Sequence, residues 1–275
     1  MNNSLNCEAC NSAKVRFEGA LDSNRVHNPS NPYPFGRSNI LVAYNKCADC
    51  GFLFSRDWVA KDSIFWNEKI YNEEYKKIVD PDWTKNRAIQ VAPLFVRLLR
   101  ILKDNFYPSV MDYGSGSGML ASLLRQSGVS EVVTYDAYTD DRQLPEGGDY
   151  DVIIAVEVFE HEISPQSLIF NFSRLLSDNG VIFFTTKTFK SPKIEYSYVA
   201  PRNGHVSIYS PKALKELGEQ GSFYYQRIAG GLLHLYSREK LGCYKLIRIN
   251  FVVVLEKAFW LLKRLSNKIF GIGHE

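Results

Sequence analysis

The 275-residue sequence has few cysteines, little net charge and no long hydrophobic run, and each shortage excludes a class of protein. Its five cysteines are too few for a disulfide-stabilised scaffold. A formal net charge of +3 is too small, for this length, to indicate a nucleic-acid-binding surface built from clustered charge. Because no run of about 18 apolar residues occurs, no transmembrane helix is expected. The hydrophobic fraction of 45% is enough to bury a core, which excludes a disordered chain.

The N-terminal residues and the thiols indicate a compartment. Residues 1–6 are polar, and the apolar segment of a secretion signal does not follow them. Thiols remain reduced in the cytoplasm, where they are available to bind metal. We therefore expect a cytoplasmic protein.

Four of the five cysteines form two Cys-x-x-Cys pairs, a pattern typical of a metal site. Two such pairs supply four thiolates in the tetrahedral arrangement that Zn²⁺ prefers. The 36 residues between the pairs exceed the usual ribbon spacing and hold strand-like stretches at 14–17 and 39–44. The sequence predicts a structural zinc ribbon with a long inserted loop, in which metal ligation replaces a core too small to hold itself. Its ligands are Cys7, Cys10, Cys47 and Cys50.

A glycine-rich turn is the strongest signal in the chain. A short apolar run ends at Asp112, glycines occupy positions 114, 116 and 118, and a helical segment begins at Met119. Glycines allow positive φ and a close approach of the backbone to a ligand. A dinucleotide-binding turn needs glycine at its sixth position, which here is Met119. The turn therefore predicts a different nucleotide-like ligand, bound at the carboxyl edge of a parallel sheet.

Two more acidic residues end strand-like runs. Asp136 follows such a run, where a carboxylate can accept both ribose hydroxyls of a nucleoside; the alternative is a solvated acid. Glu157 follows the continuous apolar run 150–156, typical of a strand buried on both faces. Only 14 residues separate Asp136 from Asp151, so we expect a trimmed crossover and a vestigial or absent third strand.

Together these motifs resemble class I S-adenosylmethionine (SAM)-dependent methyltransferases, and the cysteine pairs resemble the zinc ribbon of members that act on sugars and surface polysaccharides. The resemblance implies an α/β fold with a Rossmann-like sheet, closed by a hairpin at 223–237. In that family the glycine loop wraps the amino-acid part of SAM, the acid before the loop helps to hold the α-ammonium group, and the next acid binds the ribose. The implied cofactor-binding residues are Asp112, Gly114, Ser115, Gly116, Gly118, Asp136 and Glu157.

Two histidines are candidate catalytic bases. His161 completes an E-x-x-E-H sequence similar to that of small-molecule methyltransferases. His205, in the loop 201–211, resembles the proposed base of zinc-ribbon sugar methyltransferases. The tyrosine and glutamate of that family loop are replaced by Arg202 and Gly204, which weakens the case for C-methylation through an enolate and leaves a hydroxyl acceptor as an alternative. For each histidine a purely structural role is the other interpretation.

The chain divides into four expected segments. These are a zinc ribbon at 1–56, a helical connector at 57–106, the SAM-binding domain at 107–240 and a tail at 241–275. The tail alternates apolar and basic residues, as in an amphipathic helix that lies on an anionic membrane surface. The alternative is a helix that packs on the ribbon or on a second subunit.

The sequence therefore predicts a cytoplasmic SAM-dependent methyltransferase, with a nucleotide sugar or glycan of bacterial surface-polysaccharide biosynthesis as acceptor. An RNA methyltransferase that uses the ribbon as a grip is one alternative. Its support is weak because basic residues in the ribbon are dispersed and an Asn-Pro-Pro-Tyr motif is absent, so no nucleic-acid partner is expected. A SAM-fold binding protein without catalysis is the other, and the intact glycine loop and Asp136 argue against it.

Overall fold

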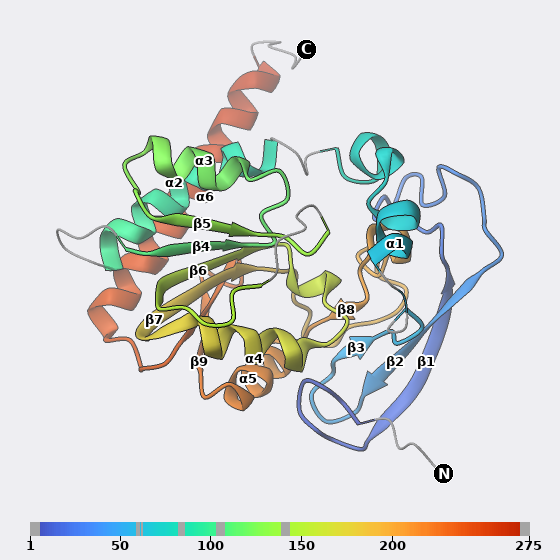
Figure 1. Cartoon of the computed structure of the whole chain (residues 1–275). Coiled ribbons are helices and arrows are strands. Elements are labelled where there is room, and N and C mark those ends of the chain that lie inside the picture. Colours follow the sequence, from blue (N-terminus) through green and yellow to red (C-terminus); the bar gives the residue numbers. More distant parts are fainter. Residues whose placement is uncertain are drawn as a thin grey trace.

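The structure of the protein is a computed structural model, and it contains two β-sheets joined by helical segments (Figure 1). The elements below all lie in the part of the chain that the structure describes, and side chains are described up to residue 262. The described residues are 6–58, 61, 63–81, 86–102, 108–138 and 144–269.

The larger sheet has six strands in the order β5-β4-β6-β7-β10-β9. The first four are parallel, whereas β10 runs antiparallel to both β7 and β9. The expected closing hairpin is thereby confirmed. The apolar run predicted to be buried on both faces forms β6, whose residues 152–155 are all buried. The strands are β4 (Val110–Tyr113), β5 (Val132–Tyr135), β6 (Tyr150–Val156), β7 (Leu176–Thr185), β9 (Tyr224–Ile228) and β10 (Leu233–Ser237).

The trimmed crossover is also present. Strand β5 is the edge of the sheet, and within the described residues between β5 and β6 no further strand occurs. Residues 139–143 of the crossover lie outside the described residues. The sheet therefore has a mixed α/β architecture with its parallel strands ending at one edge, beside the glycine turn.

Helices cover both faces of this sheet (Figure 1). One face packs against α2 (Asn86–Leu102), α3 (Met119–Gln126) and α6 (Cys243–Ile269), and the other against α4 (Pro165–Leu175) and α5 (Pro211–Gln220). Each face buries its own apolar cluster, because side chains of a central strand point alternately to the two sides.

The C-terminal helix α6 packs on α2, whereas the sequence analysis considered a membrane surface, the ribbon or a second subunit as its partner. Its Ile249 and Val253 are buried in the cluster that α2 shares with the sheet. The guanidinium of Arg97 in α2 lies 3.0 Å from a carboxylate oxygen of Glu256 in α6. No helix among the described residues is long and apolar enough to cross a membrane.

The smaller sheet combines the ribbon with a distant segment. Its order is β1-β2-β3-β8, formed by β1 (Val15–Asp22), β2 (Leu41–Cys47), β3 (Leu53–Phe54) and β8 (Ser207–Ile208). Strand β8 follows His205 in the chain and pairs antiparallel with β3. The ribbon sheet thus continues beyond residue 56 and includes the loop that holds a candidate base.

Short helical segments connect the two sheets. These are α1 (Ser63–Phe65), η1 (Trp66–Ile70) and η2 (Tyr75–Val79), together with the one-turn segments η3 (Phe159–His161) and η4 (Pro201–Asn203). Aromatic side chains of η1 and η2 are buried among those of the ribbon and of the loop before η4. This packing places the connector above the carboxyl edge of the parallel strands.

Candidate active site

A cavity of about 610 Å³ opens at the carboxyl ends of β4, β5 and β6. Its volume lies within the range of roughly 300–1,000 Å³ that is usual for small-molecule sites. The glycine turn, the segment 135–138 after β5 and the segment 156–158 after β6 form its floor, and the connector forms its opposite wall. The wall side chains are Asn67, Tyr71, Tyr75 and Lys76, which belong to the segment predicted to be a helical connector.

The glycine turn is held in a conformation that glycine alone adopts readily. Gly114, Gly116 and Gly118 have φ values of 71°, 52° and 73°. A Cβ atom on Gly114 would lie 2.5 Å from a methyl group of Val158, so the turn also has no room for a side chain there. The N–H groups of Gly114 and Ser115 both donate to the carbonyl of Tyr135, which fixes the turn against β5.

Asp136 organises the turn and faces the cavity. One carboxylate oxygen accepts the Gly116 N–H at 2.8 Å, and the other accepts the Tyr138 N–H at 2.9 Å. Its carboxylate is therefore held at the end of β5, at the place where the sequence predicted a ribose-binding acid.

Asp112 is a buried acid at the back of the same cavity. It is 2% exposed, and its Oδ2 has no hydrogen-bond partner among the residues described. Burial raises the pKa of Asp112 to about 7, and the nearby Asp136 carboxylate acts in the same direction. A cationic group placed against Oδ2 would relieve this unfavourable burial, because an adjacent positive charge favours the ionised carboxylate.

Glu157 follows β6 with a φ of 54°, an uncommon conformation for a residue other than glycine. Its N–H donates to the hydroxyl of Thr185 at 3.0 Å, which holds this backbone in place. Such strained residues occur at ligand-binding sites, and Glu157 lines the cavity.

The two candidate bases lie side by side, but only His161 lines the cavity. The ring centroids of His161 and His205 are 5.1 Å apart. His205 is buried, and its Nδ1 lies 2.7 Å from the carbonyl oxygen of Tyr198. Burial lowers the pKa of each histidine to about 3, so both imidazoles are neutral at pH 7.

Two neighbours of these histidines were given no role at the site by the sequence analysis. Glu160 is fully buried and accepts a hydrogen bond of 2.6 Å from the Tyr198 hydroxyl. Burial, with a contribution from the Glu157 carboxylate, raises the pKa of Glu160 well above its usual range. Arg202, which replaces the family tyrosine, donates to the Ile70 carbonyl at 2.7 Å and so ties η4 to the connector.

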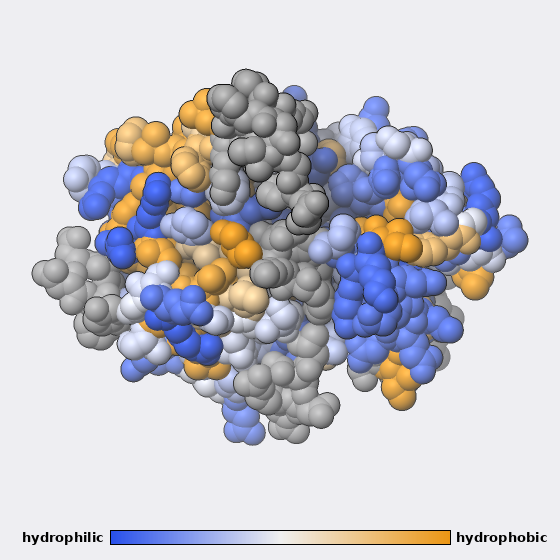
Figure 2. Space-filling view, turned by 90° about the horizontal axis from the view of Figure 1, so that it is seen from above, coloured by the Kyte–Doolittle hydropathy of each residue, from blue (hydrophilic) through white to orange (hydrophobic). Residues whose placement is uncertain are grey.

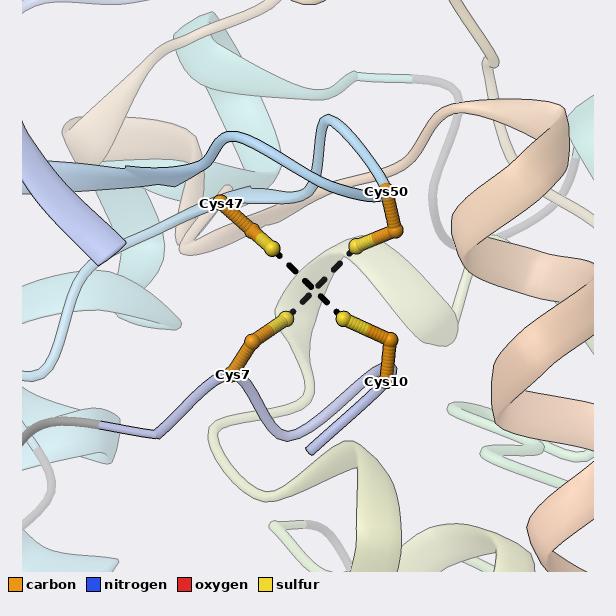
Figure 3. A group of neighbouring side chains, drawn as sticks. All are labelled: Cys7, Cys10, Cys47 and Cys50. Atoms are coloured by element: carbon orange, nitrogen blue, oxygen red, sulfur yellow. Dashed lines mark hydrogen bonds between the residues drawn. The ribbon is translucent and has the colours of Figure 1, made fainter. Parts of the chain in front are cut away.

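The four paired cysteines gather at one point in the ribbon, as Figure 3 shows. The sulfur atoms of Cys7 and Cys50 lie 3.6 Å apart, and those of Cys10 and Cys47 lie 3.5 Å apart. Thiolates bound tetrahedrally to zinc at about 2.3 Å would lie about 3.8 Å apart, so the geometry fits the ion. The fifth cysteine, Cys243, is exposed and remote in α6.

Comparison with known proteins identifies the fold family. The family described as a methyltransferase domain matches residues 83–228, a little over half of the chain. The chain therefore belongs to this family of methyltransferase domains. No curated protein sequence matches it.

Several solved structures are similar to part of the chain at low sequence identity. The pyocyanin biosynthetic protein PhzM has a TM-score of 0.43 and 16% identity, and the match covers 62% of each chain. An O-methyltransferase family protein from Burkholderia thailandensis has a TM-score of 0.45 and 12% identity over 60% of each chain. The plantazolicin methyltransferase BpumL, in complex with a monoazolic desmethylPZN analogue and SAH, has a TM-score of 0.48 and 12% identity over 68% of this chain and 84% of its own. The chain thus spans about three fifths of the length of the first two.

Proposed function

We propose that the chain is a SAM-dependent methyltransferase whose cofactor binds in the cavity over the glycine turn. The observation that carries the proposal is that two acids, Asp112 and Asp136, line the cavity beside that turn. A carboxylate anchored by two backbone N–H groups suits a ribose diol, and a buried acid with an unpartnered oxygen suits the α-ammonium group of SAM. Gly114, Ser115 and Gly116 would line the methionine part, with Glu157 near the sulfonium. Gly118 does not line the cavity, and its positive φ would serve to shape the turn.

When bound, SAM supplies an already activated methyl group, so the protein's contribution is to position the acceptor and take its proton. His161 lines the cavity, so its imidazole is placed to accept that proton. His205 packs edge-on against His161 and would act through it unless the acceptor reaches deeper than the cavity. Tyr71, Tyr75 and Tyr138 would provide aromatic surface for the acceptor or adenine.

For the acceptor, we favour a hydroxyl group of a nucleotide sugar or glycan of bacterial surface-polysaccharide biosynthesis. The resemblance of the ribbon to that of sugar methyltransferases supports this choice. The replacement of the family's loop glutamate by Gly204 favours a hydroxyl over an enolate, because the histidine then lacks a carboxylate to orient it.

Methyl transfer from labelled SAM to a panel of nucleotide sugars tests the proposal. We expect a mass gain of one methyl group on one acceptor. His161→Gln should cut turnover by about a hundredfold while leaving SAM affinity unchanged, because it removes only the proton acceptor. His205→Ala should show a comparable loss only if that histidine itself is the base.

His234→Gln is the matched control, since His234 is also buried but lies in β10 with both ring nitrogens hydrogen bonded. Calorimetry that detects no heat with SAM or with SAH would contradict the proposal. SAM binding without transfer to any acceptor would instead favour a binding protein that has lost catalysis.

We also propose that the four cysteines bind a structural Zn²⁺. Four thiolates close the coordination shell and leave no position for a substrate. The loops that carry them are bonded to α5: the Ser210 hydroxyl donates to the Cys50 carbonyl at 2.5 Å, and the Gln220 amide donates to the Ala9 carbonyl at 2.9 Å. The ion would therefore hold the ribbon against the methyltransferase domain.

The outer side of α6 is the remaining candidate for a partner. Its exposed apolar residues include Phe251, Phe259 and Leu262, and the basic residues Lys245, Arg248 and Lys257 lie on the same helix. Figure 2 shows hydrophobic side chains gathered over the half of the molecule that holds α2, α3 and α6, whereas the ribbon half is mostly hydrophilic. We propose peripheral contact of α6 with an anionic cytoplasmic membrane face. Co-sedimentation with anionic liposomes tests it, and no lipid-dependent loss of soluble protein would exclude it.

A further inference from the structure

Beside the cavity, three side chains of metal-binding type converge without sharing hydrogen bonds among themselves. They are Glu160, His161 and His205, and one ligand atom of each lies within 4.8 Å of the others. The cluster is separate from the four cysteines and combines two histidines with one carboxylate. We propose that it binds a divalent first-row transition-metal ion, with Zn²⁺ as the simplest probe.

Two orphaned polar atoms point to a missing ligand at this cluster. Glu160 is fully buried; its Oε1 accepts from Tyr198, and its Oε2 has no hydrogen-bond donor in the described part of the chain, with the Glu157 carboxylate as its neighbour. The buried Nδ1 of His161 also has no partner of hydrogen-bond geometry there, and the Gly204 backbone lies beside the ring. Leaving a buried polar atom unsatisfied costs about 1–3 kcal/mol, so two of them in one cluster call for an explanation. A cation that accepts lone pairs from both atoms supplies one.

The third member is oriented for ligation by its own hydrogen bond. The Nδ1 of His205 lies 2.7 Å from the Tyr198 carbonyl oxygen, which can only accept a hydrogen bond. Nδ1 must therefore carry the proton, and the lone pair is left on Nε2. This is the arrangement that backbone carbonyls impose on metal-binding histidines. Tyr198 thus contacts two of the three ligands, through its hydroxyl and its carbonyl.

The backbone already holds the two ligand-bearing segments together. The Val206 N–H donates to the Glu160 carbonyl at 2.9 Å, and the Ser207 hydroxyl donates to the Glu162 carbonyl at 2.7 Å. Ligands at about 2.1 Å from one ion lie about 3.4 Å apart in a tetrahedral site, so small side-chain movements close the present spacing. The chain therefore needs little reorganisation to bind an ion.

Local charge and access also fit a cation. Glu157, at the cavity edge of the cluster, adds a second carboxylate, and Arg87, whose charge acts on His161, is paired with Asp80 at 2.8 Å. Because His161 lines the cavity, an ion has a route in from it. Three protein ligands leave at least one coordination position open, as in catalytic rather than structural sites. An acceptor oxygen could take that position, and His161 would then be a ligand instead of the proton acceptor.

Metal analysis of the full-length protein tests the inference. Wild-type protein, Glu160→Gln and the control His234→Gln are equilibrated with Zn²⁺, desalted and analysed for zinc per chain. Glutamine keeps the size of Glu160 and an oxygen that accepts from Tyr198, but lacks the charge. We expect Glu160→Gln to hold one ion per chain fewer than both other proteins. Because the test compares the zinc content of the variant with that of the other two proteins, zinc at the cysteine site contributes equally to all three. The result also does not depend on SAM binding.

Cobalt loading distinguishes the two sites. Co²⁺ bound to thiolates gives an intense charge-transfer band, whereas Co²⁺ bound to nitrogen and oxygen gives only weak visible bands. We expect Glu160→Gln to lose weak bands and keep the thiolate band. His161→Gln serves in the same way if Glu160→Gln does not fold. Equal metal content in wild-type protein and the folded variant would overturn the proposal, as would loss of the thiolate band alone.

Discussion

The ribbon and the six-stranded sheet reach order by different means. The sheet buries a large apolar cluster on each face, and its glycine turn is held by hydrogen bonds within the chain. The ribbon has exposed apolar residues on its strands, including Phe17 and Leu41, and its four paired cysteines pack into one of the two apolar clusters of the sheet. Yet the two are connected, because β8, which lies in the chain between β7 and α5, pairs with β3 of the ribbon. The contrast leads us to expect that the glycine turn is held by packing and hydrogen bonds within the chain, whereas the ribbon gains stability from the zinc ion that we propose.

The largest expected effect falls on the sheet side of this contrast. Gly114→Ala places a Cβ atom 2.5 Å from Val158 at a φ of 71°, so the turn must shift. We expect SAM affinity, measured by calorimetry, to fall at least about a hundredfold, or ~2.7 kcal/mol.

Gly230→Ala is the control for that variant, because its φ is 72° and its Cβ meets nothing within 4 Å. The control should lose only about 1 kcal/mol of unfolding free energy and keep its SAM affinity. Equal SAM binding in both variants would mean that the turn is not the cofactor site.

A smaller effect is expected when the ribbon loses its ligand. Cys47→Ser should release zinc and speed amide hydrogen exchange in β1 and β2 by at least about tenfold, because the metal supplies the folding free energy there. Through the β3–β8 pairing, exchange should also rise at β8 next to His205, while α3 keeps its protection.

Cys243→Ser, which changes the exposed cysteine of α6, should leave zinc content and exchange unchanged. If β8 stays protected in Cys47→Ser, the ribbon is energetically independent of the methyltransferase domain, although β3 and β8 are paired.

The last expected effect is a change in the slope of stability with pH. The pKa of Asp112 is about 7 in the folded protein, above its value of 3.8 in the unfolded chain. The folded state therefore binds more protons between these values, and the stability from the protonated acid is lost as pH rises toward 7. Glu160 and Glu162 also have raised pKa values, so only a difference isolates Asp112.

In Asp112→Asn, the unfolding free energy should decrease less steeply between about pH 4 and 7 than in wild-type protein. The expected difference in slope is on the order of 1 kcal/mol per pH unit. Urea unfolding of wild-type protein and variant at several pH values measures this. Parallel curves would show that burial does not perturb this acid.

Much of the site was predictable because its signals are local. Asp112 and the three glycines lie within seven residues of chain, and a strand, a tight turn and a helix need only local spacing to be inferred. Asp136 and Glu157 were found by the same logic, as polar residues after apolar runs. The roles of the individual residues remain predictions, since no ligand contact tests them.

Other features depend on contacts between residues far apart in the chain. Both His161 and His205 were plausible bases from sequence, but only His161 lines the cavity. The tail had the composition of a surface helix, yet it buries Ile249 and Val253 against α2. An amphipathic pattern predicts that one face of the helix is covered, but it does not identify the element that covers this face.

By itself, the sequence determined the elements that short-range physics controls: the strand, turn and helix around the glycines, the two thiol pairs and the closing hairpin. Only the tertiary structure decided that β8 completes the ribbon sheet and that Glu160, His161 and His205 meet beside the cavity. The physical reason is that backbone propensity and hydrophobic period act over a few residues, whereas which segments share a site depends on how the whole core packs.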